Sequence, residues 1–375
     1  MSIRALVMAG GAGQRMRASG RGVPKPLVPV RGVALLERNL YALFAAGIDD
    51  VAVAVPSSLP SVGHFVRGRG RLLAEVAGAR IAVIDETEPL GTIGAAALAG
   101  DGADTLLVVN ADNLTALDLR AFLDAHRGTG AAMTVATHLH PARLPYAEVA
   151  VEEGRIVGYA EKPTHRFRVS SAIYALARRA LGELDGARTD APELVRRLLD
   201  AGATVASFAH EAPWIDVNDA AGVAAAEKIL AAHADAFDCW HPAPAIEVVG
   251  CVLVRADEVL LEYRPSTARF YADQWDTPGG KLEPGEAPAE ALVREMREEL
   301  GVALDALQPA GRFDDVDATS RQVFRHHVFA AEARQPPAAR EGQTLAWVPR
   351  ARLAGLEGLG AAARRSLAAL EAGTR

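Results

Sequence analysis

The sequence is poor in several features that mark particular protein classes. It has only two cysteines, Cys239 and Cys251, so neither a disulfide framework nor a zinc constellation is available, and both residues are expected to pack as small apolar groups. No apolar run approaches the length that spans a membrane, and the first residues run into a strand-like segment rather than a signal peptide. We expect a cytoplasmic protein with no membrane partner.

Lysine is also scarce, because almost all of the basic residues are arginine. The formal net charge is −7, which argues against a nucleic-acid-binding surface as the main function. Lysine and arginine total 40, yet lysine occurs only at Lys25, Lys162, Lys228 and Lys281. Because arginine serves wherever a general positive charge suffices, a retained lysine indicates a task for a compact ammonium group. All but Lys228 lie within motifs.

The length and overall composition indicate a globular protein of more than one domain. The chain has 375 residues, 50% of them hydrophobic and 23% charged. A single hydrophobic core rarely organises so many residues, so two domains are expected. No internal repeat is visible, and the two halves carry different motifs.

Residues 280–302 form the most informative segment. The spacing predicts a helix over 288–300 that begins at Pro288, with Leu292, Val293, Met296 and Leu300 on an apolar face. Three acids fall together on another face: Glu295, Glu298 and Glu299. Crowded carboxylates repel one another unless a hard cation such as Mg²⁺ or Mn²⁺ lies among them. A solvated acidic face is the alternative, but it would need neither the preceding Gly-Gly turn nor the spaced Glu286 and Arg294.

Position for position, this segment resembles the Nudix box: Gly280, five residues, Glu286, seven residues, then Arg-Glu-apolar-any-Glu-Glu-any-Gly-apolar. The resemblance implies an α/β/α sandwich that hydrolyses a nucleotide diphosphate. In it Glu295, Glu298 and Glu299 would hold Mg²⁺ or Mn²⁺ and supply the base for water attack. Arg264 and Gly280 would lie beside the substrate, and Trp275 either beside the cleft or in the core. His326 and His327 are adjacent, so at most one can face the cleft.

The N-terminal region predicts a phosphate-binding loop. Residues 3–9 read as a buried strand, and Gly10, Gly11, Gly13 and Arg15 follow where a helix would begin. Backbone N–H groups freed by glycine suit an anion, although a glycine-rich turn alone could be only a tight turn. Pro24-Lys25-Pro26-Leu27 comes soon after, so the glycines do not stand alone.

Together these two motifs resemble the signature of nucleotidyltransferases that join a nucleoside triphosphate to a sugar 1-phosphate or a similar phosphorylated alcohol. The resemblance implies a Rossmann-like, GT-A-like domain with a mostly parallel central sheet. Gly10, Gly11, Gly13 and Arg15 would hold the triphosphate, and Lys25 would face phosphates.

Further motifs extend this resemblance along the chain. Glu88, Gly91 and Thr92 lie in a Pro-Leu-Gly-Thr loop where the family places base and sugar contacts, although the loop could serve only to start a helix. Asn110 and Asp112 end an apolar strand, where open α/β sheets bind ligands. The family uses this aspartate for Mg²⁺, and the alternative for Asp112 is a turn that ends the strand.

The third set of motifs concerns the acceptor. Glu161 and Lys162 match the family's Glu-Lys-Pro element, whose acid touches a sugar and whose lysine grips the acceptor phosphate. Residues 146–148, Tyr-Ala-Glu, stand where relatives have Tyr-Gly, which leaves the acceptor open. Asp216 matches the second metal aspartate, but its context, Asp-Val-Asn-Asp, is unusual, and a helix cap by Asn218 or Asp219 is the alternative there.

We therefore expect a nucleotidyltransferase domain at 1–235, a linker at 236–245 and a Nudix hydrolase domain at 246–375. The favoured hypothesis is a bifunctional enzyme, with Mg²⁺ or Mn²⁺ in both domains, that uses GTP, CTP or UTP. One alternative is a cytidylyltransferase acting on an amino-alcohol phosphate or phosphonate, with the second domain a regulatory nucleotide-binding or dimerising module. Another is a hydrolase scaffolded by the first domain. The sequence leaves open whether the protein forms a homodimer.

Overall fold

The computed structural model describes residues 2–10, 23–100, 102–237, 240–333, 335–340 and 342–373. The chain divides into two compact units, residues 1–74 with 79–241 and residues 242–375 with 75–78. The main boundary, between His241 and Pro242, lies inside the segment expected to be a linker. No helix in the described part of the chain combines the length and apolar character needed to cross a membrane.

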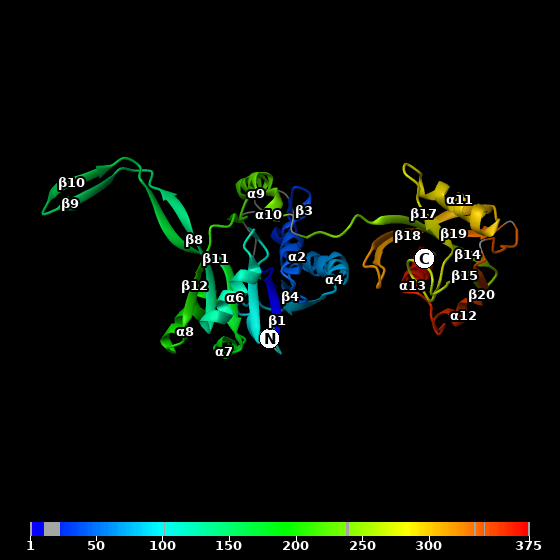
Figure 1. Ribbon diagram of the computed structural model, residues 1–375, viewed down its shortest axis with the longest axis horizontal. Coiled ribbons are helices and arrows are strands. Elements are labelled where there is room, and N and C mark those ends of the chain that lie inside the picture. The colour runs from blue at the N-terminus through cyan, green and yellow to red at the C-terminus, as the bar shows by residue number, and fades with distance from the viewer. Residues whose placement is uncertain are drawn as a thin grey trace. The chain divides into compact units, whose positions relative to one another are not determined.

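The first unit is built on a seven-stranded sheet in the order β12-β8-β11-β6-β1-β4-β5 (Figure 1). In chain order its strands are β1 (Ile3–Met8), β4 (Asp50–Pro56), β5 (Arg80–Glu86), β6 (Thr105–Asn110), β8 (Met133–Arg143), β11 (Thr164–Ala177) and β12 (Val205–Ala209). Only β11 runs antiparallel to its neighbours. The expected mostly parallel sheet is confirmed, and the carboxyl ends of β1, β5 and β6 meet at one edge.

Helices cover this sheet because the strands are apolar on both faces. The helices of this unit are α2 (Leu35–Ala45), α3 (Pro60–Phe65), α4 (Arg71–Ala77), α5 (Ala96–Ala99), α6 (Leu119–Thr129), α7 (Arg178–Leu181), α8 (Ala191–Asp200), α9 (Ala220–Ala232) and α10 (Ala234–Phe237), with a π-helical turn at Val66–Gly70 between α3 and α4. Side chains of α5, α7 and α8 share one core with β1, β4, β6 and β8. Between α10 and the unit boundary, Trp240 packs edge-on against Tyr41 and Phe44 of α2.

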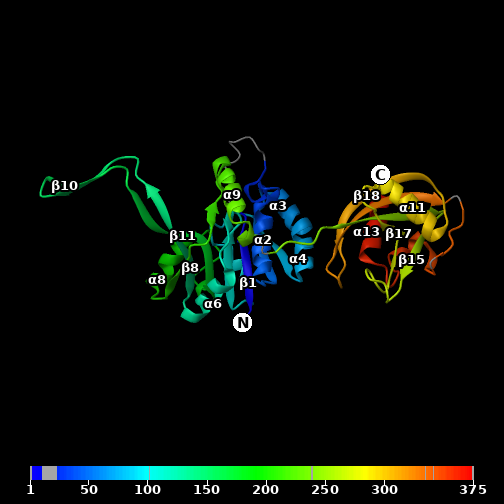
Figure 2. The same ribbon diagram turned by 45° about the horizontal axis from the view of Figure 1, so that its top comes forward.

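A long ribbon leaves the sheet, as both views show (Figures 1 and 2). The outer parts of β8 and β11 stay paired as far as Arg143 and Thr164, and a separate hairpin of β9 (Glu148–Glu152) and β10 (Arg155–Ala160) extends beyond them. The register of β8 and β11 shifts between Ser170 and Tyr174, where the ribbon joins the sheet. We call residues 138–169 the arm.

The second unit is a mixed sheet with helices on both faces. Its strands are β14 (Ile246–Arg255), β15 (Glu258–Arg264), β16 (Gln274–Asp276), β17 (Gly279–Lys281), β18 (Leu304–Val316), β19 (Val323–Ala333) and β20 (Thr344–Pro349), and its helices are α11 (Pro288–Leu300), α12 (Arg350–Leu353) and α13 (Ala361–Gly373). Along β14, Cys251 and Leu253 pack in the core that contains α11, whereas Val252 packs in the core that contains α13. This alternation confirms the expected α/β/α sandwich. Cys251 is a buried small apolar group, as predicted, and Cys239 lies outside the described residues.

Candidate active sites

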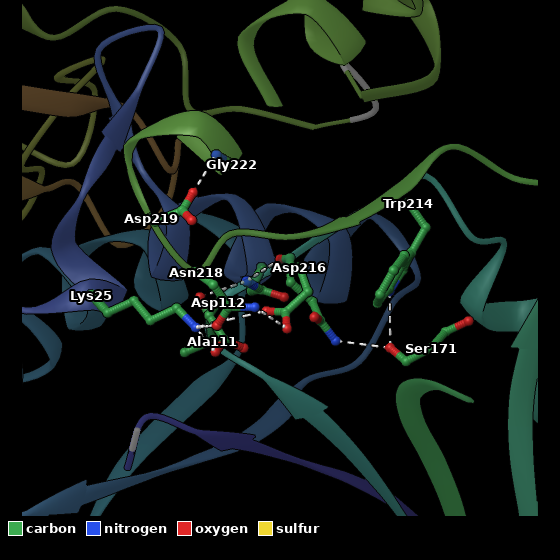
Figure 3. Close-up of polar contacts among 11 residues, drawn as sticks. Lys25, Ala111, Asp112, Ser171, Trp214, Asp216, Asn218, Asp219 and Gly222 are labelled. Atoms are coloured by element: carbon green, nitrogen blue, oxygen red, sulfur yellow. Dashed lines mark hydrogen bonds and ion pairs between the residues drawn. The ribbon is translucent and has the colours of Figure 1, made fainter. Parts of the chain in front are cut away.

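A cluster of charged side chains lies at the carboxyl edge of the first sheet (Figure 3). Lys25 sits on a short 3₁₀ helix, η1 (Lys25–Leu27), and is only 8% exposed. Its Nζ donates hydrogen bonds to Asp112 and, at 2.6 Å, to Oδ1 of Asn218. Oδ1 of Asp216 is 3.7 Å from the same nitrogen. The structure thus brings Lys25, Asp112 and Asp216 together, as the sequence predicted.

A small ladder sets the two aspartates side by side. β7 (Asn113–Thr115) follows Asp112 directly and pairs antiparallel with β13 (Trp214–Asp216), which places Asp216 opposite Asn113. The Val217 N–H donates to the Asp112 carbonyl at 3.0 Å. Burial, opposed by Lys25, raises the pKa of Asp112, and the nearby Asp216 raises it further. Two carboxylates in this arrangement need a shared positive charge.

Asn218 and Asp219 have different roles, which decides which of them caps the helix after Asp216. Asp219 caps α9 by accepting from the Gly222 N–H at 2.8 Å. Asn218 does not cap the helix, because its amide donates to Oδ2 of Asp216 at 2.6 Å while its oxygen accepts from Lys25. Sequence reasoning assigned Asn218 only to a cap, and nothing in the local pattern pointed to Lys25, which lies 193 residues away.

The donor set of this cluster fits a divalent cation. Oδ1 of Asp216 is buried and has no hydrogen-bond partner, and Asp112 supplies a second hard carboxylate oxygen beside it. In the described part of the chain, no group of three or more His, Cys, Asp or Glu side chains is arranged to hold a metal ion, so the candidate set here is this pair of aspartates. Oxygen ligands of this kind, completed by phosphate and water, suit Mg²⁺.

Glu86, a residue that the sequence did not single out, lies at the same sheet edge. It ends β5, is 3% exposed, and has one buried carboxylate oxygen without a hydrogen-bond partner. A Cβ on Gly10 would lie 2.9 Å from the other oxygen, so the glycine leaves room for this carboxylate. Burial raises the pKa of Glu86, partly offset by a backbone hydrogen bond from Leu90. A buried carboxylate with one unpaired oxygen, beside the strand that leads to the glycine loop, is a candidate ligand-binding group.

The structure describes only some of the remaining residues that the sequence predicted for this site. Gly11, Gly13 and Arg15 lie outside the described residues. Asn110 ends β6, with a buried side-chain oxygen that lacks a partner. Gly91 has a φ of +82°, and a Cβ there would lie 2.5 Å from the Thr189 carbonyl.

Two other residues of the Pro-Leu-Gly-Thr loop differ in their surroundings. The hydroxyl of Thr92 accepts from the Ala191 N–H at 2.9 Å, and its own N–H donates to Asp190. Thr92 therefore ties the loop to the start of α8, whereas Glu88 is exposed. The helix expected after the loop is short, since α5 covers only Ala96–Ala99.

The arm separates Glu161 and Lys162 from this cluster. Both are exposed at the junction of its two ribbons, with 4.0 Å between Lys162 Nζ and a Glu161 oxygen. Lys162 lies seven residues along the chain from Val169, which pairs with His138 where the arm begins, and six of those residues belong to β11. At about 3.3 Å per residue this is roughly 23 Å. Lys162 thus lies outward along the arm, which projects from the sheet (Figure 1).

A groove lies at the base of the arm. Its cavity measures about 630 Å³, and its lining includes His138, Arg166, Arg168, His210 and Trp214. Trp214 lies two residues before Asp216, and its indole N–H donates to the Ser171 carbonyl at 2.9 Å, as Figure 3 shows. Trp214 is thus the residue of the groove lining that is nearest in sequence to Asp216.

In the second unit, the predicted helix 288–300 is observed with these bounds as α11. Leu292, Met296 and Leu300 are buried and Val293 is half-buried. The helix ends at Gly301, whose φ of 67° is favoured by glycine. The apolar face predicted from the spacing is confirmed.

Arg294 organises the acidic face. Its guanidinium pairs with Glu286 at 2.8 Å, with Glu295 at 2.8 Å and with Glu298 at 3.3 Å, and it donates to the Lys281 carbonyl at 3.0 Å. A Cβ on Gly280 would lie 2.1 Å from the Glu295 carboxyl carbon, so only glycine admits this approach. Carboxylates are suitable ligands for Mg²⁺ or Mn²⁺, but in this structure Arg294 pairs with Glu295 and Glu298, and the three acids of the helix, all within the described residues, are not arranged as a metal site.

A cavity of about 100 Å³, lined by both aromatic and charged side chains, lies beside this acidic face. Its lining includes Arg264, Gly280, Phe270, Tyr271, Phe324 and His326. Burial lowers the pKa of His326 to about 4 and raises that of Asp276, also in the lining, to about 6. His327 instead pairs with Glu247 at 2.5 Å, so one histidine of the pair faces the cavity, as predicted. Trp275 packs against Tyr263 in the α13 core, which resolves its alternatives in favour of the core.

Comparison with known families identifies a domain in each unit. Residues 4–232 match the model of the nucleotidyl transferase family, and residues 245–370 match that of the NUDIX domain. The chain belongs to the nucleotidyl transferase family and carries a NUDIX domain after the transferase domain.

The curated relatives match part of the chain. A mannose-1-phosphate guanylyltransferase of Mycobacterium tuberculosis is 30% identical over 256 residues, which cover 65% of this chain and 67% of that protein. Mannose-1-phosphate guanylyltransferase 1 of Arabidopsis thaliana is 29% identical over 49% of this chain, and the match spans only 52% of the plant protein. A glucose-1-phosphate thymidylyltransferase of Streptomyces antibioticus is 30% identical over 58% of this chain and 64% of its own length.

Among solved structures, HddC from Yersinia pseudotuberculosis complexed with GMP-PN aligns with 60% of this chain and 98% of its own. That alignment has a TM-score of 0.47 and 20% sequence identity.

Proposed function

We propose that the first unit transfers a nucleoside monophosphate from a nucleoside triphosphate to a sugar 1-phosphate or a similar phosphorylated polyol. The products are a nucleoside diphosphate sugar and pyrophosphate. The observation that carries this proposal is the cluster of Lys25, Asp112, Asp216 and Asn218 at the edge where β1 and β6 end. Relatives that carry out such transfers are consistent with it.

In this reaction a phosphate oxygen of the acceptor attacks the α-phosphorus, and the bond from that phosphorus to the oxygen of the β-phosphate breaks. No covalent enzyme intermediate is needed. Asp112 and Asp216 would hold Mg²⁺, which would neutralise charge on the phosphates when bound. Lys25 places a positive charge beside them, and Asn218 fixes the positions of Lys25 and Asp216. The chain thus contributes mainly positioning and electrostatic stabilisation. Arg15, Lys162 and Glu161 complete the proposed set.

We further propose that the base is guanine and that Glu86 selects it. A buried carboxylate with a free acceptor oxygen suits the Watson–Crick edge of guanine, which presents two neighbouring N–H donors. Uracil and cytosine present an acceptor at the corresponding edge, which the Glu86 carboxylate would repel. The position of Glu86 beside Gly10 supports this, because Gly10 leads into the glycine loop proposed for the triphosphate.

For the second unit we propose hydrolysis of a nucleoside-diphosphate-linked compound. Glu295, Glu298 and Glu299 would hold Mg²⁺ or Mn²⁺, and one of them would serve as the base for the attacking water. Phe270, Tyr271 and Phe324 offer aromatic surface for a base beside that acidic face. Arg264 also lines the cavity and supplies positive charge for a phosphate.

The test of the first activity is a screen of GTP, ATP, CTP, UTP and dTTP against a panel of sugar 1-phosphates. Pyrophosphate release and product mass are followed in the presence of Mg²⁺. We expect release with GTP and a hexose 1-phosphate, and no release without an acceptor. Release only with CTP and an amino-alcohol phosphate would overturn the sugar assignment, and a full panel without release would overturn the transferase assignment.

A further inference from the structure

The outer hairpin of the arm has an apolar face that the rest of its chain leaves uncovered. Val151 pairs with Ile156 and Val149 with Tyr159, so these four side chains share one face. The opposite face carries Glu148, Glu152 and Arg155. Ile156 is 67% exposed and Tyr159 69% exposed. A lone two-stranded hairpin is marginally stable in water, so an amphipathic one indicates a surface that covers its apolar side.

The rest of the arm continues this pattern. Most of the exposed large hydrophobic side chains in the described part of the chain belong to it: Leu139, Leu144, Tyr146, Val149, Val151, Ile156, Val157, Tyr159 and Phe167. Apolar exposure concentrated on one projection marks a protein contact surface.

The arm also carries two residues that the proposed function needs elsewhere. Glu161 and Lys162 belong to the proposed acceptor site, yet they lie about 23 Å along the strand from the base of the arm. The ribbon of β8 and β11 is paired continuously from Thr137 with Ser170 to Arg143 with Thr164. It cannot fold back over its own base without breaking that ladder.

We propose that two copies of this chain exchange arms, so that the arm of each copy lies across the partner's Lys25–Asp112–Asp216 cluster and supplies Glu161 and Lys162 to it. This inference rests on the proposed transferase function. A symmetric pair makes each contact twice, so both sites are completed together. The site then contains a compact ammonium from each copy, Lys25 from one and Lys162 from the other.

Spacing favours a second copy of this chain as the partner that covers the arm. Lys162 lies about midway between the base and the tip of the arm. When the two arms cross in antiparallel directions, Lys162 of one copy therefore reaches the base of the partner's arm. The outer hairpin then extends over the partner's surface, which covers its apolar face.

Complementation between two inactive variants tests this exchange. Asp112→Asn disables the carboxylate cluster and keeps the arm, whereas Lys162→Ala disables the exposed arm lysine and keeps the cluster. The two variants are co-expressed with different tags, and the mixed dimer is purified through both tags. One of its two sites then joins an intact cluster to an intact arm, so we expect about half of the wild-type rate per chain.

Three controls make the outcome decisive. Each variant alone should retain under about 1% of wild-type pyrophosphate release, in line with the loss of a group that stabilises the transition state. Asp216→Asn replaces Asp112→Asn in a second pair, in case one substitution perturbs folding. Lys228→Ala changes an exposed lysine outside the arm and the site, and it should leave the rate unchanged. Failure to capture a mixed dimer, or a captured dimer without activity, overturns the exchange.

Sedimentation separates this inference from the function on which it rests. We expect the wild-type chain to sediment as a dimer and Ile156→Asp, on the apolar face of the hairpin, as a monomer with reduced transfer. If the wild-type chain shows no transfer but is a dimer that Ile156→Asp dissociates, the proposed function fails and the arm contact stands. A monomeric wild-type chain at the assay concentration overturns the arm contact.

Discussion

The ammonium of Lys25 donates to the carboxylate of Asp112 across 87 residues of sequence, and Asn218 accepts from the same nitrogen. Lys25 is one of four lysines in a chain that otherwise uses arginine. A guanidinium fork would not fit the narrow space among Asp112, Asp216 and Asn218, whereas a compact ammonium does. This contact joins the Pro-Lys-Pro motif to the end of β6, where the proposed metal ligand Asp112 lies.

Replacing Lys25 should therefore reduce transfer without unfolding the first unit. We expect Lys25→Ala to lower kcat for pyrophosphate release by about 100- to 1,000-fold, because it removes a preorganised positive charge beside the phosphates. Lys25→Arg should not restore the rate, because the larger group cannot occupy the same space. Lys228→Ala is the matched control, and a Lys25→Arg enzyme with wild-type rate would contradict the special role of the ammonium.

The two proposed activities should be separable by substitution. Glu298→Gln should abolish diphosphate hydrolysis and leave pyrophosphate-releasing transfer intact, and Asp112→Asn should do the opposite. Each change removes one carboxylate charge from a different site. Both activities are measured on the same preparations, with melting temperature as the folding control. If either substitution removed both activities from a folded protein, the model of two independent sites would be wrong.

Substitution of Glu86 should change the preference for the base. Glu86→Gln replaces one of two acceptor oxygens by a donor, so we expect the ratio of kcat/KM for GTP to that for UTP to fall by about 10- to 100-fold. Asp85→Asn is the control, since the adjacent side chain on β5 points to the other face and is exposed. An unchanged ratio in Glu86→Gln would show that another group selects the base.

Arg294 should matter for hydrolysis through positioning. Arg294→Lys loses the paired hydrogen bonds to Glu286, at 2.9 and 2.8 Å, and the bond to the Lys281 carbonyl. We expect hydrolysis to fall at least about 10-fold and the second unit to lose about 1–3 kcal/mol of unfolding free energy. Arg297→Lys, exposed on the same helix, should change neither quantity. If Arg294→Lys and Arg297→Lys had equal effects, the hydrogen bonds from Arg294 to Glu286 and to the Lys281 carbonyl would not be their cause.

The buried His326 should make the stability of the second unit depend on pH. Burial holds its folded-state pKa at about 4, below the usual 6.5, so the stabilisation from a neutral ring is complete above 6.5. It is lost as the pH falls through about 4, and the loss amounts to about 3 kcal/mol. His326→Phe should lack this component, which urea unfolding at pH 7 and pH 4 measures. His64→Gln, exposed in the first unit, should keep the wild-type dependence on pH.

Local sequence patterns were sufficient to predict the elements whose functional residues lie close together along the chain. The helix α11, its apolar face and its three acids follow from residues within 23 positions of one another, and the structure shows the helix with the predicted bounds. The buried strands and the expected parallel sheet likewise follow from apolar runs that end at glycine or a carboxylate. In such segments the side-chain direction is fixed by the period of the helix or strand.

Long-range contacts decided the rest of the candidate sites. The local pattern offered Asn218 or Asp219 as a helix cap, and only folding shows that Asp219 caps α9 while Asn218 joins Lys25 to Asp216. The sequence did not mark Glu86 as a candidate residue. It became one only because the fold buries its carboxylate beside Gly10. The hydroxyl of Thr92 accepts a hydrogen bond at the start of α8, a contact 99 residues away that the local pattern did not indicate.

The sequence by itself determined the two families and the residue types of both sites, since these depend on short spacings that survive without knowledge of the fold. Only the tertiary structure decided which residues meet. It joined Lys25 to Asp112 and Asp216, and it placed Lys162 on an arm, about 23 Å along the chain from the base of that arm. The physical reason is that spacing along the chain fixes side-chain direction within one element, whereas strand pairing and ribbon length fix the distances between elements.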